Sequence, residues 1–265
     1  TADPKVWSKT VLFVLFDEND GFFDHMPPPS APSVRLDGSL AGASTCDDST
    51  ERYKGAKFYS NNWVMGPGMR LPAYVVSPWS RGGWVNSQMF SHDSVTQFIE
   101  QRFGVVNPNI SAWRRAFCGD LMSCFNFDSP NDEAFPKLPS MSKDEADALR
   151  HEQEQLEQVP VPDGAALPQQ EVGLRYSRAL PYELHVHCSA SVSSIELRFD
   201  NTGAAGAVFH VYDNNNLLAE PRRYCVEAGK SLYDSWVGAG PYDLWVLGPN
   251  GFHRAFKGVN TPAAA

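Results

Sequence analysis

An unbroken apolar run at residues 11–16, which stops at two acidic residues, constrains the fold of this chain more than any other feature. The run reads Val-Leu-Phe-Val-Leu-Phe, which is too short for a helix of ordinary length and rich in residues that favour strands. A continuous apolar run of this kind is typical of a strand buried on both faces, as in a parallel sheet covered by helices. The sequence therefore predicts an α/β fold built around this strand.

Acidic side chains gather where the predicted strand ends. Asp17 and Glu18 follow it directly, and Asp20, Asp24 and His25 come soon after. In open α/β sheets the ligand site lies beyond the carboxyl ends of the strands. Closely spaced carboxylates repel one another unless a cation or a shared proton compensates their charge, and hard divalent cations prefer oxygen ligands. We therefore expect Asp17 and Glu18 to bind one divalent metal ion of unknown identity; a solvated acidic turn is the alternative.

Composition narrows the classes of function. The formal net charge is −9 and Lys and Arg form no cluster, which argues against nucleic acid as a partner. No apolar run approaches the roughly 20 residues of a membrane span, so we expect no transmembrane segment. The five cysteines show no Cys-x-x-Cys zinc spacing, and their pairing stays open.

A second apolar segment, at residues 71–77, predicts another short strand, and an aromatic turn follows at residues 78–84. His92 then precedes apolar residues with helical spacing, which Gly104 is suited to end. We therefore expect His92 at the entry of a helix that follows a strand. A polar residue near a helix cap is the alternative interpretation of His92.

Three further segments predict a loop and two helices. Residues 39–62 lack a sustained period and predict a long surface loop. A later helix carries Arg114 and Arg115 on its polar side, where a solvated face is favoured over a phosphate site. Residues 141–158 predict a charged helix with a weak apolar stripe, and the prolines after it indicate a linker.

Beyond residue 180 the pattern changes to short alternating segments. They are separated by turns rich in Gly and Asn, at a spacing of about 8–12 residues. This pattern is typical of a small antiparallel β-sandwich.

Motifs along nearly the whole chain resemble one family, in the family's order. They are Asp-Glu-Asn-Asp-Gly-Phe-Phe-Asp-His-Met-Pro-Pro-Pro at residues 17–29, Ser-Pro-Trp-Ser-Arg-Gly-Gly-Trp-Val at 77–85 and Asn-Ile-Ser-Ala-Trp-Arg-Arg at 109–115. These motifs resemble the bacterial phospholipase C and acid phosphatase family. Residues 178–187, 201–212 and 242–254 resemble the C-terminal β domain of that phospholipase.

The resemblance implies a partial alkaline-phosphatase-like sheet with helices on both faces, followed by the β-sandwich. Residues 1–140 would be the C-terminal part of the phosphoesterase catalytic domain, and residues 141–178 a charged helix and linker. Residues 179–259 would be the β-sandwich domain, and residues 260–265 a tail.

In function, the resemblance implies a secreted or periplasmic bacterial enzyme that acts on a phospholipid at a membrane surface. Phospholipase C hydrolyses phosphatidylcholine- and sphingomyelin-type phosphodiesters to phosphocholine and diacylglycerol or ceramide. An acid-phosphatase-type phosphomonoesterase and a non-catalytic module that binds lipid or the cell surface are the alternatives.

The resemblance also assigns roles to residues. Asp17 and Glu18 would be the metal ligands, and His92 would lie near the reacting phosphate, where His92 or His25 could donate a proton to the leaving alcohol. The family usually has Asp-His-Thr-Ser around this histidine, whereas this chain has Ser-His-Asp-Ser at residues 91–94.

The nucleophilic hydroxyl of the family lies upstream of Thr1. We therefore expect this chain to be part of a longer protein, to pair with an upstream catalytic half and to be inactive alone. Trp79 and Trp84 could line a choline pocket through cation–π contact, or they could pack in a core.

Overall fold

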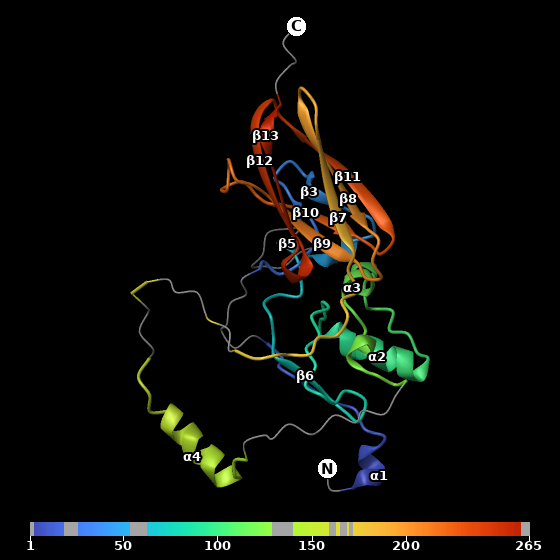
Figure 1. Cartoon of the computed structure of the whole chain (residues 1–265), viewed down its shortest axis with the longest axis vertical. Helices are drawn as coiled ribbons and strands as arrows, with labels where there is room; N and C mark the ends of the chain where they lie inside the picture. Colours follow the sequence, from blue (N-terminus) through green and yellow to red (C-terminus); the bar gives the residue numbers. More distant parts are fainter. Residues whose placement is uncertain are drawn as a thin grey trace.

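The computed structural model describes residues 3–18, 26–53, 63–128, 140–158, 163–164, 169 and 172–260 (Figure 1). It contains mixed sheets and few helices, consistent with an α/β fold followed by a β domain. The first part comprises α1 Pro4–Trp7, β1 Leu12–Leu15, β2 Ser33–Val34, β3 Leu40–Ser44, η1 Ser49–Glu51, β4 Arg52–Tyr53, β5 Trp63–Val64, β6 Ala73–Val76, α2 Asp93–Phe103, α3 Ala112–Phe117, η2 Met122–Cys124 and α4 Lys143–Gln153.

The second part is all β apart from one short turn of helix. It comprises β7 Leu184–Ala190, β8 Ser194–Asn201, β9 Ala207–Asp213, β10 Arg222–Val226, β11 Lys230–Val237, β12 Gly240–Leu247, η3 Pro249–Gly251 and β13 His253–Asn260. The expected C-terminal β domain is therefore confirmed. None of the helices that the structure describes is long and apolar enough to cross a lipid bilayer.

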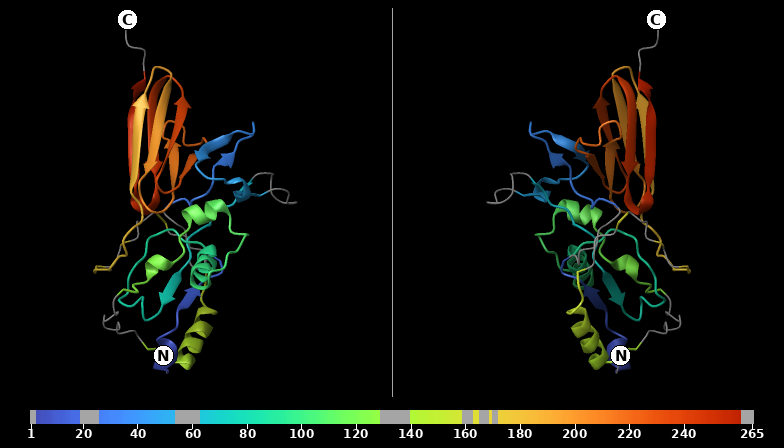
Figure 2. Two further views of the ribbon diagram at one scale, coloured as in Figure 1. Left: turned by 90° about the vertical axis from the view of Figure 1, so that its right-hand side faces the viewer. Right: turned by 90° about the vertical axis from the view of Figure 1, so that its left-hand side faces the viewer.

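Two sheets pack face to face in this β domain (Figure 2). One has the order β13-β12-β9-β10-β3-β2, and the other has the order β11-β8-β7. Alternate side chains of each strand point between the sheets, where Leu197 and Phe199 of one layer contact Phe209, Val211 and Val246 of the other. Because all five side chains are fully buried, the domain has a complete core of its own.

The segment expected to be a long surface loop instead contributes to this sandwich. Within residues 39–62, β3 pairs in parallel with β10, although the two strands are far apart in sequence. Gly42 makes this close approach possible, since a Cβ at that position would lie 1.8 Å from the carbonyl oxygen of Arg223. The loop prediction was thus wrong for β3 and for β4, while residues 54–62 lie outside the described residues.

A smaller hydrophobic cluster joins the first part of the chain to the β domain. Trp113 and Phe117 of α3 pack against Val208 and Cys225 of the sandwich. The indole N–H of Trp113 donates to Sγ of Cys225 at 3.3 Å. The two parts therefore share a packed boundary rather than a free linker.

The strand predicted at residues 11–16 is present as β1, but the prediction that it is buried on both faces was wrong. β1 pairs antiparallel with β6 in a two-stranded sheet, with Leu15 opposite Ala73. Leu12, Val14 and Leu15 are between 38% and 50% exposed.

The physical reason is that burial on both faces needs neighbours on both faces. Among the described residues, the ring contacts of β1 lie on one face, where Phe13 meets Phe98 of α2 at 5.1 Å and Phe125 at 6.5 Å between ring centroids. An apolar run shows that a strand is able to bury both of its faces. Whether both faces are buried depends on the helices and strands that pack against it.

The charged helix expected within residues 141–158 is confirmed as α4. Ser142 and Glu145 form a capping box at its start, and none of its side chains is buried. Figure 1 shows α4 set apart from both the sandwich and the β1–β6 sheet.

Candidate active site

The carboxyl end of β1 carries the two acids expected to bind a metal. Asp17 and Glu18 are both exposed, and Oδ1 of Asp17 accepts a hydrogen bond from the backbone N–H of Glu18 at 3.1 Å. His25, the second candidate proton donor, lies outside the described residues, as do Asp20 and Asp24.

His92 lies directly against this strand end. Its Nε2 is 2.9 Å from the carbonyl oxygen of Phe16, the residue before Asp17. A carbonyl oxygen can only accept, so Nε2 carries the hydrogen in this contact. The structure thereby brings together three of the predicted site residues, Asp17, Glu18 and His92, from segments about 75 residues apart in the chain.

Helix α2 holds His92 at this position. His92 is the residue before the first helical turn, and Gly104 ends the helix in the left-handed conformation, with φ of +67°, as predicted. The backbone N–H of Ser91 donates to Oγ of Ser94 at 3.0 Å, which closes the turn around the histidine. The tilted rings of Phe98 and Phe125, with centroids 5.2 Å apart, both contact Phe13 and so pack the same helix against β1.

An ion-pair network links the entry of α2 to the boundary with the β domain. Glu51 is 4% exposed and accepts hydrogen bonds from Oγ of Ser111 and, at 3.1 Å, from Nε of Arg114. Nη1 of Arg114 lies 3.8 Å from Oδ2 of Asp93, the neighbour of His92 in the chain. Through Asp93 this network reaches the first turn of α2, next to His92.

Arg115, which follows Arg114 on helix α3, forms a second ion pair. It donates to both carboxylate oxygens of Glu100 on α2, at 2.8 and 3.0 Å. These hydrogen bonds lower the pKa of Glu100 to about 2. The interpretation of Arg114 and Arg115 as a solvated helix face was therefore wrong, because both guanidinium groups bind carboxylates of other elements.

Sequence reasoning missed Glu51 and Asp93 as partners of these arginines. Glu51 lies in the stretch interpreted as a surface loop, and nothing in its local pattern marks it as buried. For Asp93 the sequence did offer a signal, because this aspartate follows His92 where the family usually has threonine.

The two tryptophans of the aromatic turn lie in different surroundings. Trp79 packs on Phe127, with ring centroids 5.7 Å apart. Trp84 lies beside Tyr176 at 5.2 Å, and the guanidinium of Arg178 lies 4.6 Å from the centre of its ring. The ring of Trp84 thus already contacts a cation of the protein itself, the guanidinium of Arg178. That Trp79 and Trp84 together line a choline pocket stays a prediction.

The donor set at the strand end fits a hard divalent cation only in part. Asp17 and Glu18 offer carboxylate oxygens to solvent, as such an ion requires. Within the described ranges, however, no group of three or more His, Cys, Asp or Glu side chains is arranged to hold a metal. Asp17 and Glu18 alone would supply only part of the coordination shell of such an ion.

Comparisons with known proteins agree with the motifs. Residues 1–106 match the phosphoesterase family, and residues 176–259 match the family described as bacterial phospholipase C, C-terminal domain. The chain is 54% identical over 262 residues to the non-hemolytic phospholipase C of Pseudomonas aeruginosa and 49% identical over 275 residues to that of Burkholderia pseudomallei. It is 36% identical over 292 residues to the hemolytic phospholipase C of Pseudomonas aeruginosa.

These alignments cover 97%, 99% and 97% of the chain, respectively, but only 38% of each relative. The chain therefore spans less than half the length of the curated relatives it matches. The phosphoesterase match precedes the C-terminal domain match, in the order that the motifs predicted. Residues 1–106 belong to the phosphoesterase family, and residues 176–259 belong to the C-terminal domain family of bacterial phospholipase C.

Proposed function

We propose that this chain supplies part of the catalytic site and the β domain of a phospholipase C. The substrates would be phosphatidylcholine- and sphingomyelin-type phosphodiesters, and the products phosphocholine with diacylglycerol or ceramide. The relatives' names support the reaction class. The single observation that carries the proposal is the contact of His92 with the carbonyl of Phe16, which places an imidazole beside the acidic pair.

In this proposal Asp17 and Glu18 hold one divalent metal ion together with ligands from outside the described residues. When bound, such an ion compensates the charge that develops on the phosphoryl oxygens. The carboxylates of Asp17 and Glu18 are exposed at the strand end and so are accessible to both a metal and a substrate.

His92 would transfer a proton to the leaving alcohol. Its contact with the Phe16 carbonyl is satisfied by the Nε2–H of both neutral and protonated imidazole. Nδ1 can therefore lose and regain a proton without breaking the contact that positions the ring. His25 is the second candidate for this role.

The remaining parts would come from an upstream catalytic half of the same protein. That half would carry the nucleophilic hydroxyl and complete an alkaline-phosphatase-like sheet. The exposed apolar residues of β1 and β6, such as Val14 and Tyr74, support this assignment, because a two-stranded sheet with uncovered apolar faces is marginal alone. We expect the isolated chain to lack hydrolytic activity.

We place the complete enzyme outside the cytoplasm, secreted or in the periplasm, where it meets membrane phospholipid. The β domain would support attachment to the lipid surface, and Trp79 and Trp84 would contact the choline group.

The test uses the intact enzyme with two chromogenic substrates, a phosphocholine diester and the corresponding phosphomonoester. We expect hydrolysis of the diester and a loss of about 100-fold or more in kcat for His92→Asn. The control His151→Asn changes an exposed histidine on α4 and should leave the rate unchanged. Preferential hydrolysis of the monoester would favour the phosphatase alternative. Liposome binding without hydrolysis of either substrate would favour the non-catalytic module.

A further inference from the structure

A hollow opens at the end of the β-sandwich nearest the carboxyl terminus, away from β6 and α2 (Figure 1). Its volume is about 120 Å³, well below the roughly 300–1,000 Å³ of sites for drug-sized ligands. Residues of both sheets line it, with Ile195 and Trp236 from one sheet and Tyr242 and Asp213 from the other. The hollow therefore suits one small chemical group.

The hollow is bordered by the turn between β11 and β12, where the residues have no side chain or only a methyl group. The turn consists of Gly238 and Ala239, and Gly240 follows as the first residue of β12. A Cβ built on either glycine would meet no heavy atom within 4 Å. Gly240 has φ of +107°, which only glycine adopts readily. Nδ2 of Asn260 donates to the carbonyl of Gly238 at 2.7 Å, which ties the turn to the end of β13.

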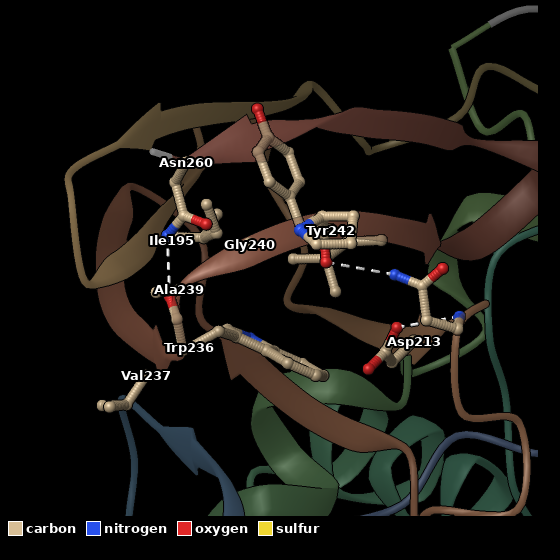
Figure 3. Close-up of a pocket in the computed structure, with 12 residues that line it drawn as sticks. Ile195, Asp213, Trp236, Val237, Ala239, Gly240, Tyr242 and Asn260 are labelled. Carbon is tan, nitrogen blue, oxygen red and sulfur yellow. Dashed lines mark hydrogen bonds between the residues drawn. The ribbon is translucent and has the colours of Figure 1, made fainter. Parts of the chain in front are cut away.

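Two aromatic rings form opposite walls of the hollow. Figure 3 shows Tyr242 on one side and Trp236 on the other. The indole N–H of Trp236 donates to Oη of Tyr224 at 3.0 Å, which fixes the indole. Tyr242 lies across Gly258 of the neighbouring strand, where a Cβ would come within 2.6 Å of its hydroxyl oxygen. Both rings are thus positioned before any ligand binds.

Asp213 is the one charged side chain among the residues that line the hollow. Its Oδ1 accepts the backbone N–H of Asn215 at 3.0 Å. Other aspartates of the sandwich strands have cationic partners: Arg198 for Asp200, Arg222 for Asp234 and Lys257 for Asp243. In the described part of the chain, Asp213 forms no such ion pair, so its negative charge faces the hollow uncompensated.

A carboxylate between aromatic walls is suited to an organic cation. The carbonyls of Gly238 and Pro241 already accept hydrogen bonds from the side chains of Asn260 and Asn215. A primary ammonium group needs several free acceptors, whereas a methylated ammonium group needs none. The guanidinium of Arg222 lies 3.9 Å from the centre of the Trp236 ring, which shows that this ring accepts a cation. Asp234 neutralises that guanidinium at 3.0 Å, so Arg222 does not set a bare positive charge against a ligand.

We propose that the hollow between Trp236, Tyr242 and Asp213 binds a trimethylammonium group, as found in choline. The inference goes beyond the proposed hydrolysis and does not depend on it, because its readout is binding to this chain. The group could come from free choline or from a phosphatidylcholine headgroup. Val237, which lies at the rim and is 87% exposed, is placed to contact a lipid surface in the second case.

The test titrates the isotopically labelled 265-residue chain with choline and follows its amide and indole resonances. We expect the Trp236 indole signal and the amides of Gly238 and Gly240 to shift in a saturable way. The probe 3,3-dimethylbutan-1-ol has the shape of choline without its charge and should bind about tenfold more weakly or worse. Equal binding of the two probes, or no saturable shift at these residues, would overturn the proposal.

A pair of matched variants distinguishes a specific effect of the Asp213 carboxylate on choline binding from a general effect of removing one negative charge. Asp213→Asn should weaken choline binding about tenfold, whereas Asp243→Asn, whose carboxylate pairs with Lys257, should not. Tyr242→Phe keeps the ring and should retain binding, while Tyr242→Leu should weaken it. An equal loss in both aspartate variants would contradict the assigned site. The comparison of the two probes needs no variant and so does not depend on mutant folding.

A vesicle experiment identifies the source of the cation. If the ligand is a headgroup, the chain co-sediments with phosphatidylcholine vesicles but not with phosphatidylglycerol vesicles, and free choline competes. Val237→Ser should then weaken vesicle binding and leave the choline titration unchanged. Choline binding without vesicle binding would assign the site to soluble choline compounds.

Discussion

The β-sandwich and the β1–β6 sheet are both built from apolar strands, yet they differ in how much they bury. In the sandwich, Phe199 and Phe209 are fully covered, whereas Leu12 and Tyr74 in the small sheet are 50% and 60% exposed. The sandwich has a second layer, whereas the ring contacts of the small sheet among the described residues come from Phe98 of α2 and from Phe125. The comparison teaches that the strands of the β domain bury their apolar side chains against a second sheet, while the strand that precedes Asp17 leaves apolar side chains exposed.

The largest effect should come from the sandwich core. Phe199 stacks on Tyr224 at 4.4 Å and lies 5.1 Å from Phe209, so Phe199→Ala should lower the free energy of unfolding by about 3–5 kcal/mol. Phe103→Ala, at a ring of α2 that is 67% exposed, is the control and should cost far less. Urea unfolding of the chain measures both. Similar losses in the two variants would remove the contrast between the two regions.

A somewhat smaller effect is expected at the boundary between them. Arg114→Met leaves the carboxylate of Glu51 buried without its cation, which should cost about 3 kcal/mol in unfolding free energy. Arg150→Met breaks an exposed pair on α4 and should cost less than about 0.5 kcal/mol. If both variants unfold at the same urea concentration, the boundary does not couple the two parts.

The pH dependence of stability should trace to the sandwich. Burial lowers the pKa of His210 to about 4, and nearby Arg223 adds to this effect. The unfolded chain binds a proton at this histidine below about pH 6.5 and the native chain does not, so stability falls between about pH 6.5 and 4. The loss from this residue should reach about 2 kcal/mol at pH 5.

His210→Gln should therefore flatten the profile of unfolding free energy between pH 7 and 5. His253→Gln removes an exposed histidine of β13 and should leave the profile as it is. An unchanged slope in the His210 variant would show that the buried imidazole is not the source.

The smallest effect is expected in the exposed sheet. Leu15→Ser removes an apolar side chain that is 38% exposed, so the unfolding free energy of this chain should change by less than about 0.5 kcal/mol. In the intact enzyme the same change should cost about 2 kcal/mol or more if an upstream half covers the strand. Equal effects in the two proteins would argue that nothing packs on β1.

The sequence predicted what depends on local pattern and missed what depends on distant pairing. Alternation and turn residues predicted the β domain, and spacing before Gly104 predicted α2 with His92 at its entry. Neither the pairing of β3 with β10 nor the burial of Glu51 leaves a local pattern, because both depend on residues far away in the chain. The contact of His92 with Phe16 was likewise beyond local reasoning, and the motif resemblance supplied that juxtaposition instead.

The central claim, that the end of β1 is a metal-dependent hydrolytic site, is tested most directly by the metal content of the intact enzyme. Wild type and the control Asp144→Asn, changed on exposed α4, should each retain one tightly bound divalent ion per catalytic site. Asp17→Asn should lose most of that metal and its hydrolytic activity together. Full metal content in Asp17→Asn would contradict the account.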